Sequence, residues 1–379
     1  MKTKRKVAIT HSASSMDRLN AVCPYFTMFP IAFPRKLLAG AHRSDVVLDP
    51  FCGRGTSNYA ARERGMLSYG IDTSPVAVAI ARAKLVNTTF DDVMQLAWTL
   101  LNSTRTPAAP RGTFWRSAYH QDTLSEIVRI RHGLLSRHQS PAATMLRAIM
   151  LGCLHGPLPN HLENAGYFSN QMPRTYAPKP AYSVRYWKNL GLVPPRIPAL
   201  IPIQRKAAAI FVSHMSPSNS PHSSITLGDS RSKSSYRHVT RGVSHIITSP
   251  PYYGLRTYLT DQWMRNWFLG GEATVPYGGE HQLSHASPRE FATSLSKVWN
   301  NCGEVLRRSG RLIIRFGAIG SRDIDPRVLI DESLSLSEHS WSIYRTVPVR
   351  NARPEKRQAH HMGTGTAALR EYDFFVKPT

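Results

Sequence analysis

Short apolar runs alternate along much of the chain with amphipathic or alanine-rich segments, a pattern typical of strands that alternate with helices. The apolar runs predict strands at 45–49, 66–72, 224–230, 245–248, 311–317, 341–349 and 372–377. Helical periodicity predicts helices at 31–38, 57–64, 75–84, 93–101, 124–138, 142–154, 261–268 and 291–306, with a basic turn at 307–310. This alternation indicates an α/β fold: a doubly wound, Rossmann-like sheet that binds ligands at the carboxyl ends of its strands.

The alternation is interrupted in the middle of the chain, where helical patterns give way to segments rich in Pro, Tyr, Asn and Arg. A Ser-rich stretch at 213–224 has the composition of a linker. We therefore divide the chain into a basic tail over 1–23, a sheet domain over 24–90 and 224–379, and a large, mostly helical and loop insertion over 91–223. The tryptophans of 261–268 are expected in a core rather than at a ligand.

The charge of the chain indicates a polyanionic partner. Lys and Arg number 48 against 24 Asp and Glu, for a net charge of +24 and an isoelectric point near 10.3. Nucleic acid is the first candidate partner and an anionic membrane surface the second. No apolar run approaches the roughly 18 residues of a membrane span, and the basic start lacks a signal-peptide core. We expect a soluble, cytoplasmic protein associated with the nucleoid, with no membrane partner.

The cysteines and histidines do not show the spacing of a metal site. The cysteines lie far apart and none belongs to a C-x-x-C pair, so neither a disulfide framework nor zinc is indicated. His360 and His361 are adjacent rather than four residues apart, so they do not match the spacing of a helical metal site. The sequence predicts no metal.

A glycine turn follows the first strand. Asp49 ends that strand, and Gly53 and Gly55 then allow left-handed backbone and close approach of a ligand, just before a predicted helix. The turn is neither a phosphate-cradling P-loop nor a full G-x-G-x-x-G motif, so ATP and NAD are disfavoured. The carboxylate of Asp49 would repel a pyrophosphate but attract a cationic ammonium or sulfonium group.

Two more carboxylates follow strands of the same sheet. Asp72 ends the second strand, at the distance from the glycine turn where a doubly wound fold places the acid that binds ribose hydroxyls. Asp229 ends the third strand and is a candidate acceptor for the amino group of an adenine. Together these residues predict a nucleoside cofactor.

The fourth strand ends at Ser249-Pro250-Pro251-Tyr252. Two prolines stiffen the loop and hold the Ser249 side chain and the Pro250 carbonyl as fixed acceptors. Tyr252 and Tyr253 are expected to present flat aromatic faces. Such a site suits a planar base with an amino group, lifted out of its stack for chemistry. The alternative is a proline-rich surface turn whose tyrosines pack over a core edge.

The run Asp49-Pro50-Phe51-Cys52-Gly53-Arg54-Gly55-Thr56, taken with Ser249-Pro250-Pro251-Tyr252, resembles the S-adenosylmethionine-dependent methyltransferases of exocyclic amino groups in DNA bases. The tetrapeptide is most similar to the N4-cytosine branch, and the resemblance covers 24–90 and 224–379. The segment 24–30, with Phe29, resembles the cofactor-covering motif of that family. The resemblance implies cofactor contacts from Phe29, Asp49, Pro50, Phe51, Gly53, Gly55, Thr56, Asp72 and Asp229, and catalytic contacts from Ser249, Pro250, Pro251 and Tyr252.

By this resemblance the glycine turn lies against the methionine part of S-adenosylmethionine, Asp72 holds the ribose and Asp229 the adenine, while Ser249, Pro250 and Tyr252 hold the flipped base. We expect a site-specific N4-cytosine methyltransferase of double-stranded DNA, acting in restriction-modification or host DNA protection, with a cognate restriction endonuclease as a candidate partner.

The insertion is the expected site of target recognition, although many Ser-Pro-Pro-Tyr enzymes place recognition elsewhere. Two alternatives stay open: N6-adenine methylation of DNA and N2-guanine methylation of transfer RNA. A basic DNA-binding protein on a degenerate scaffold and a protein-glutamine methyltransferase rank lower. The recognition sequence and the oligomeric state also stay open.

Overall fold

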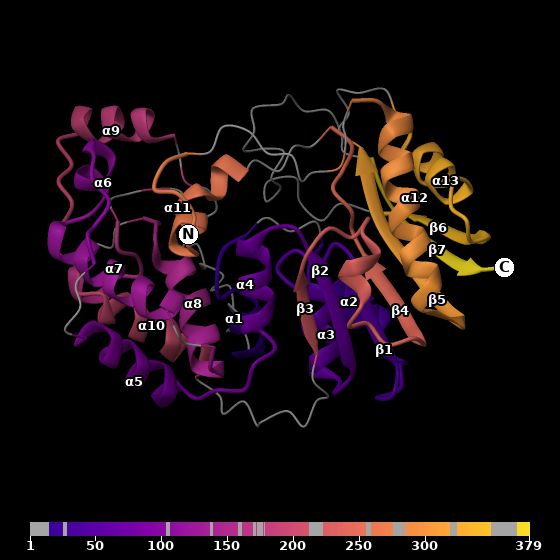
Figure 1. Ribbon diagram of the computed structural model, residues 1–379, viewed down its shortest axis with the longest axis horizontal. Coiled ribbons are helices and arrows are strands. Elements are labelled where there is room, and N and C mark those ends of the chain that lie inside the picture. Colours follow the sequence, from indigo (N-terminus) through magenta and orange to yellow (C-terminus); the bar gives the residue numbers. More distant parts are fainter. Residues whose placement is uncertain are drawn as a thin grey trace, which may run out of the picture.

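In the part of the chain that the structure describes, seven strands form one sheet in the order β3-β2-β1-β4-β5-β7-β6 (Figure 1). Their bounds are β1 (Val46–Asp49), β2 (Leu67–Asp72), β3 (Ser224–Leu227), β4 (Val243–Thr248), β5 (Leu306–Ala318), β6 (Trp341–Pro348) and β7 (Arg370–Pro378). Neighbours from β3 through β5 pair in parallel, while β7 runs antiparallel between β5 and β6. The predicted doubly wound α/β sheet is confirmed. The strand order reverses beside β1 and β4, where such sheets bind ligands.

The computed structural model describes residues 15–25, 29–103, 107–136, 139–157, 161–169, 172, 177, 179–211, 223–254, 259–275, 283, 286–318, 324–349 and 370–379. Most of the predicted tail, nearly all of the linker, part of the segment 24–30 and the loop holding His360 and His361 lie outside these residues.

Helices cover both faces of the sheet because successive strand residues point to opposite sides. Val47 packs in a cluster with α2 (Ala32–Leu37) and α3 (Thr56–Glu63). Leu48, the next residue, belongs to a cluster formed with α12 (Pro288–Val305) and α13 (Pro326–Ser335). Because both faces are covered, the strands are apolar at consecutive positions, which explains why they read as continuous apolar runs.

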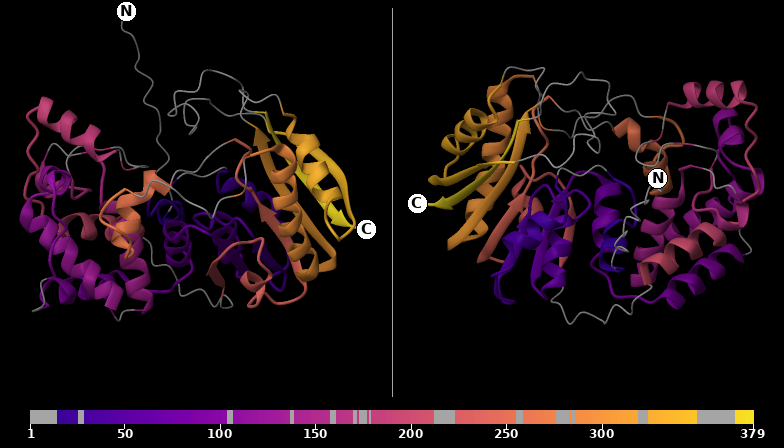
Figure 2. Two further views of the ribbon diagram at one scale, coloured as in Figure 1. Left: turned by 45° about the horizontal axis from the view of Figure 1, so that its top comes forward. Right: turned by 180° about the vertical axis from the view of Figure 1, so that it is seen from behind.

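A helical region lies beside the sheet, next to α4 (Pro75–Ala83) (Figures 1 and 2). Its members are α1 (Ser15–Asn20), α5 (Phe90–Leu101), α6 (Thr113–Ala118), α7 (Gln121–Ser136), α8 (Pro141–Cys153), α9 (Pro180–Asn189), α10 (Leu200–Phe211) and α11 (Trp263–Phe268), with short 3-10 turns at Leu162–Asn164 and Leu259–Gln262. They share one apolar cluster, which includes the buried Trp263 and Trp267. The expectation that these tryptophans belong to a core is confirmed. A third 3-10 turn, Lys233–Tyr236, belongs to the sheet half.

The helical region extends beyond the predicted insertion, since α1 and α11 pack into the same cluster. The expectation of a basic tail is therefore wrong for 15–23, where Leu19 and Cys23 are fully buried. No helix in the described part of the chain has the length and apolar character that a bilayer span requires.

Two local predictions fail for physical reasons. The segment 307–310 is not a turn, because β5 begins at Leu306 and its pairing with β4 shifts register between Val243 and His245. The helices α9 and α10 were not predicted. Pro180 and Pro202 read as breakers, but each lies in the first turn of its helix, where proline removes no helical hydrogen bond.

Candidate active site

The glycine turn after β1 separates an open side from a packed side. Gly53 has φ 49° and Gly55 φ 71°, the left-handed region that favours glycine. A Cβ on Gly53 would meet no atom within 4 Å, whereas one on Gly55 would lie 2.8 Å from the Cβ of Ala81 in α4. Gly55 therefore serves helix packing, and Gly53 leaves room for a ligand.

Asp72, at the end of β2, is tied directly to this turn. Its Oδ2 accepts a hydrogen bond from the Gly53 amide at 2.8 Å, and its Oδ1 accepts one from the Ser74 amide at 2.8 Å. The Ser74 hydroxyl caps α4 by accepting from the Ala77 amide, and the Tyr25 hydroxyl donates to it at 3.4 Å. Burial raises the pKa of Asp72, and the hydrogen bonds from the Ser74 and Gly53 amides oppose this rise. Asp72 thus lies directly against the glycine turn, the side of the sheet where its predicted role as a ribose acceptor would place it.

Asp49 is buried at the end of β1 and bonded to the neighbouring strand. Its Oδ1 accepts from the Thr248 hydroxyl at 2.7 Å and from the Phe51 amide at 3.1 Å. Burial raises its pKa to about 7, with a smaller contribution from the charge of Asp72, while hydrogen bonds from Thr248, Ser57 and Phe51 oppose the rise. In the described part of the chain, no Lys, Arg or His side chain forms an ion pair with Asp49.

Thr248 is the last residue of β4, so its bond to Asp49 fixes the start of the tetrapeptide. The next residue, Ser249, is buried, and its Oγ makes no hydrogen bond of acceptable geometry to any described residue. It lies close enough to the Tyr252 hydroxyl to oppose the rise of the Tyr252 pKa. A buried hydroxyl without a full partner is costly, so a hydrogen-bond donor that reached it would be favoured.

The two tyrosines are not exposed, so the expectation of aromatic faces at the mouth of the strand is wrong. Tyr252 is fully buried with its ring edge-on to Phe316, and Tyr253 packs in the same way on Phe291. The Tyr252 hydroxyl donates to Oε1 of Glu371 in β7. Burial and the adjacent Glu371 carboxylate hold the pKa of Tyr252 well above its ordinary value.

The partner of Tyr252 belongs to a buried charged group that the sequence did not reveal. Glu371 and Asp373 are alternate residues of β7, and Arg315 of β5 donates two hydrogen bonds to Asp373 at 2.6 and 2.8 Å. The Arg315 guanidinium also lies 3.7 Å from the centre of the Phe33 ring. The sequence signal for this group was the pair of acids at alternate positions of the predicted last strand. Nothing in the sequence pairs them with Tyr252, which lies more than a hundred residues away.

The other predicted site residues lie nearby with local partners. Asp229, just after β3, accepts from the Arg231 guanidinium at 2.6 to 3.0 Å, so its carboxylate is already shared. The Ser230 hydroxyl donates a hydrogen bond to the Pro50 carbonyl, and this bond joins the loop after β3 to the glycine turn. Phe29 is buried against Phe33, their ring centres 5.2 Å apart. Thr56, also buried, is the first residue of α3.

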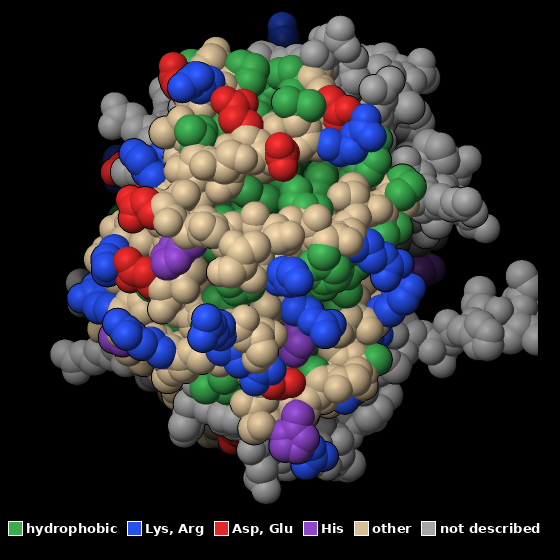
Figure 3. All heavy atoms as spheres, turned by 90° about the vertical axis from the view of Figure 1, so that its right-hand side faces the viewer, with side chains coloured by type: hydrophobic (Ala, Val, Ile, Leu, Met, Phe, Trp, Pro, Cys, Tyr) green, Lys and Arg blue, Asp and Glu red, His purple; other side chains and the backbone are tan. Residues whose placement is uncertain are grey.

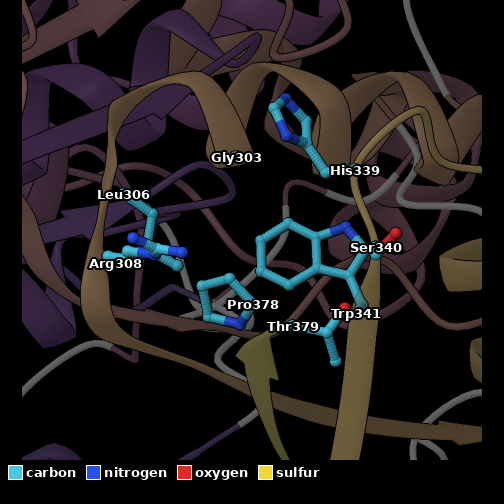
Figure 4. Close-up of a pocket in the computed structure, with 8 residues that line it drawn as sticks. All are labelled: Gly303, Leu306, Arg308, His339, Ser340, Trp341, Pro378 and Thr379. Atoms are coloured by element: carbon cyan, nitrogen blue, oxygen red, sulfur yellow. The ribbon is translucent and has the colours of Figure 1, made fainter.

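A cavity of about 250 Å³ lies at the opposite end of the sheet, where β5 and β6 begin and β7 ends (Figure 4). Its lining includes the rings of His339 and Trp341 together with Leu306, Arg308 and Pro378. None of the predicted site residues lines it. The carboxyl edge, and not this cavity, is the candidate active site.

Comparison with known proteins gives one family match. Residues 5–83, which include the glycine turn and Asp72, match a family model described as DNA methylase, N6_N4_Mtase. The match supports an exocyclic-amino DNA methyltransferase and does not separate the N4-cytosine from the N6-adenine branch. A search of curated proteins finds no match.

Among solved structures, a precorrin 8W decarboxylase of Methanobacterium thermoautotrophicum is similar at 9% identity and a TM-score of 0.33, over 93% of this chain and 92% of that chain. A geranyl diphosphate methyltransferase in complex with SAM is similar at 9% identity and a TM-score of 0.35, over 92% and 84%. Similarity this weak carries no argument about function, which is therefore argued from the residues of the site.

Proposed function

We propose that the protein transfers a methyl group from S-adenosylmethionine to the exocyclic N4 amino group of cytosine in DNA. The observation that carries this proposal is the buried Ser249 hydroxyl, which lacks a full hydrogen-bond partner at the end of β4. It lies one residue from Thr248, whose hydroxyl is bonded to Asp49. One edge of the sheet thus offers a hydrogen-bond acceptor and, beside it, a buried acid for a cationic cofactor.

The residues of the glycine turn fit S-adenosylmethionine. Gly53 leaves open space where a Cβ would stand, and the Asp72 oxygens each keep a lone pair for a ribose hydroxyl beyond their amide bonds. Asp49 has no cationic partner among the described residues, so its ionised form favours a positively charged group nearby. Asp229 can still accept from an adenine amino group, shared with Arg231. When bound, S-adenosylmethionine supplies an electrophilic methyl group on a sulfonium.

The tetrapeptide would then act on the target amino group. The nitrogen lone pair of such a group is delocalised into the ring, so the group is a weak nucleophile and needs orientation. The Ser249 hydroxyl oxygen and the Pro250 carbonyl oxygen would each accept a hydrogen bond from one N–H of this amino group. These two bonds would direct the nitrogen lone pair toward the methyl group. The proton released after transfer leaves to solvent. No covalent bond to the protein is required, and the tetrapeptide offers no thiol nucleophile of the kind that C5 methylation of cytosine uses.

We assign Tyr252 a positioning role in place of the base stacking expected from the sequence. Its ring is buried on Phe316 and its hydroxyl is bonded to Glu371, so stacking would require both contacts to break. By anchoring the end of the tetrapeptide to β7, Tyr252 keeps Ser249 and Pro250 in place. Glu371 would be the residue that holds Tyr252.

Support for DNA as the substrate comes from the family match and from the net charge of +24. N4-cytosine is the finer part of the proposal and depends on the Ser-Pro-Pro-Tyr resemblance. N6-adenine in DNA and N2-guanine in transfer RNA would place the same kind of amino group at the same acceptors. The proposal also includes target recognition by the insertion over 91–223, a restriction endonuclease as partner and a role in host DNA protection, all of which depend on the resemblance.

The proposal can be tested by methyl transfer in vitro. Purified protein is incubated with labelled S-adenosylmethionine and either mixed-sequence duplex DNA or total transfer RNA, and the nucleosides are then separated. We expect label in N4-methylcytosine from DNA, and initial rates about 10²- to 10³-fold lower with Ser249→Ala. Label in N6-methyladenine would move the chemistry to the adenine branch, and label confined to transfer RNA would overturn the DNA assignment.

A further inference from the structure

The helix α9 has one buried face and one face that is exposed among the described residues. Ser183 and Trp187, four residues apart, are buried, and the Trp187 ring packs against Phe114 of α6. This contact fixes how α9 is rotated. The opposite face of the helix is therefore held outward by the core.

The outward face carries a dense set of hydrogen-bond donors. Tyr182 and Tyr186 are 59% and 41% exposed, and their rings stack 6.4 Å apart at 14°. Also exposed along α9 and at its start are Lys179, Arg185, Lys188 and Asn189. No carboxylate of the described residues forms an ion pair with Arg185 or Lys188. Arg185 and Lys188 therefore bring positive charge that no described ion pair neutralises, whereas the charge of Lys179 acts on Asp261, where it opposes the rise of the Asp261 pKa that burial causes.

α9 lies on the same side of the molecule as the candidate active site. Figures 1 and 2 show α9 on the side of the molecule toward which β5 runs, and that is the carboxyl edge of the sheet. The face over β6 and α13 differs, because its Lys and Arg side chains are mixed with Asp and Glu (Figure 3). Of these two surfaces, α9 is the one on the side of the proposed reaction, and its Arg185 and Lys188 form no ion pair with an acid of the described residues.

We propose that α9 contacts the sugar-phosphate backbone of the substrate DNA, an inference that rests on the proposed function for the identity of its partner. Tyr hydroxyls, Asn amides, Lys ammonium groups and Arg guanidinium groups are the donors that proteins direct at phosphates. A helix rises about 1.5 Å per residue, so Lys179 and Arg185 lie roughly 9 Å apart along the axis. A duplex carries about one charge per 1.7 Å, and the α9 donors can therefore reach several phosphates at once. The contacts position DNA and do not read its sequence.

The test measures binding of a fluorescent duplex by anisotropy at several salt concentrations, with full-length protein. Arg185→Ala with Lys188→Ala should reduce the slope of log affinity against log salt by about 2, because each lost phosphate contact lowers it by about 1. Tyr182→Phe with Tyr186→Phe removes neutral donors only. We expect this pair to weaken binding roughly fivefold at every salt concentration and to leave the slope unchanged.

Matched controls come from the far edge of the sheet. Arg345 and Lys377 are exposed on β6 and β7, and Tyr344 is an exposed tyrosine beside them. Arg345→Ala with Lys377→Ala removes the same charge as the α9 pair and should leave the slope within about 0.5 of wild type, and Tyr344→Phe should leave the affinity unchanged. Circular dichroism shows whether each variant is folded.

Three results would overturn the inference: equal slope changes in the α9 and control pairs, no change in either, or a change in sedimentation rather than DNA affinity, which would make α9 a surface between copies of the chain. Failure of the proposed function is distinguishable. A wild-type protein that binds DNA through α9 but transfers no methyl group would retain this inference and lose the methyltransferase assignment.

Discussion

Two aspartates of the same strand segment have opposite electrostatic environments. Asp45, at the amino end of β1, accepts from the His42 amide and lies 3.1 Å from Arg307 and 3.5 Å from His245. Burial alone would raise its pKa, but hydrogen bonds from His42, Ser244 and His245 and the charge of Arg307 lower it. Asp49, at the carboxyl end, has hydrogen bonds but no cation, and its pKa rises to about 7.

The difference indicates that acids at the amino edge of the sheet stabilise the fold, while acids at the carboxyl edge are placed to bind a ligand. At the amino edge the acid is paired with cations of the chain, so it contributes to folding. At the carboxyl edge Asp49 and the Ser249 hydroxyl are left with incomplete partners, which costs stability and favours a ligand. We therefore expect substitutions at the carboxyl edge to reduce activity, and substitutions at the amino edge to reduce stability and leave activity near that of the wild type.

The largest effect is expected at Ser249. Ser249→Ala removes the acceptor that we propose for the target amino group and should lower kcat about 10²- to 10³-fold, with little change in cofactor affinity. Ser244→Ala is the matched control on the same strand, since the Ser244 hydroxyl accepts from the Val46 amide at the amino edge. Single-turnover kinetics should find its kcat near that of wild type. Equal kcat losses in both variants would break the comparison.

Asp49 should give the next largest effect, on cofactor binding. Since its pKa is about 7, it ionises as pH rises through neutrality, and affinity for a cationic cofactor should rise over the same range. Below pH 7 the ionised fraction falls about tenfold per unit, and the affinity should follow it. Asp49→Asn should bind the cofactor roughly tenfold more weakly at pH 8 and lose the pH dependence. Calorimetric titration at pH 6 to 8 measures this, and an unchanged pH profile in the variant would contradict it.

The positioning role of Tyr252 predicts a smaller loss. Tyr252→Phe keeps the buried ring but removes the hydrogen bond to Glu371, and should lower kcat about fivefold to tenfold with the cofactor dissociation constant unchanged. Glu371→Gln retains an acceptor and should lose less activity than Glu371→Ala. Tyr252→Ala should reduce turnover far more than cofactor binding. A rise of the cofactor dissociation constant equal to the loss of kcat in Tyr252→Phe would exclude the role.

The smallest effects concern stability and should have opposite signs in the two aspartates. The pKa of Asp49 is raised, so its ionisation lowers the free energy of unfolding as pH rises from the ordinary value of 3.8 to about 7, and Asp49→Asn should be more stable than wild type at pH 8. The pKa of Asp45 is lowered, so it stabilises the fold above pH 4 and loses this effect as the solution becomes more acid. Asp45→Asn should lose about 1 kcal/mol at pH 7. Urea unfolding across pH tests both signs.

The sequence predicted the sheet well because its information is local. Each parallel strand is a short apolar run, and the glycine turn needs Gly53 and Gly55 in left-handed backbone, which few residues other than glycine adopt. The position of Asp72 at the end of β2, beside the glycine turn after β1, could be expected from the spacing of the two segments. These features require no knowledge of distant contacts.

The parts that sequence reasoning missed depend on contacts between distant segments. Tyr252 reads as an exposed aromatic beside two prolines, but its burial is decided by Phe316 and by Glu371 on β7. Residues 15–23 look like a basic tail, but Leu19 packs into the helical cluster. Neither outcome follows from periodicity, because burial depends on which surfaces meet.

The most direct test of the central claim is single-molecule sequencing of DNA from cells that express the wild-type protein or Ser249→Ala. The account predicts N4-methylcytosine at a defined sequence with the wild-type protein and its absence with the variant, although both are folded and bind S-adenosylmethionine. Equal N4-methylcytosine in the two samples would show that the tetrapeptide at the end of β4 is not the site of methyl transfer.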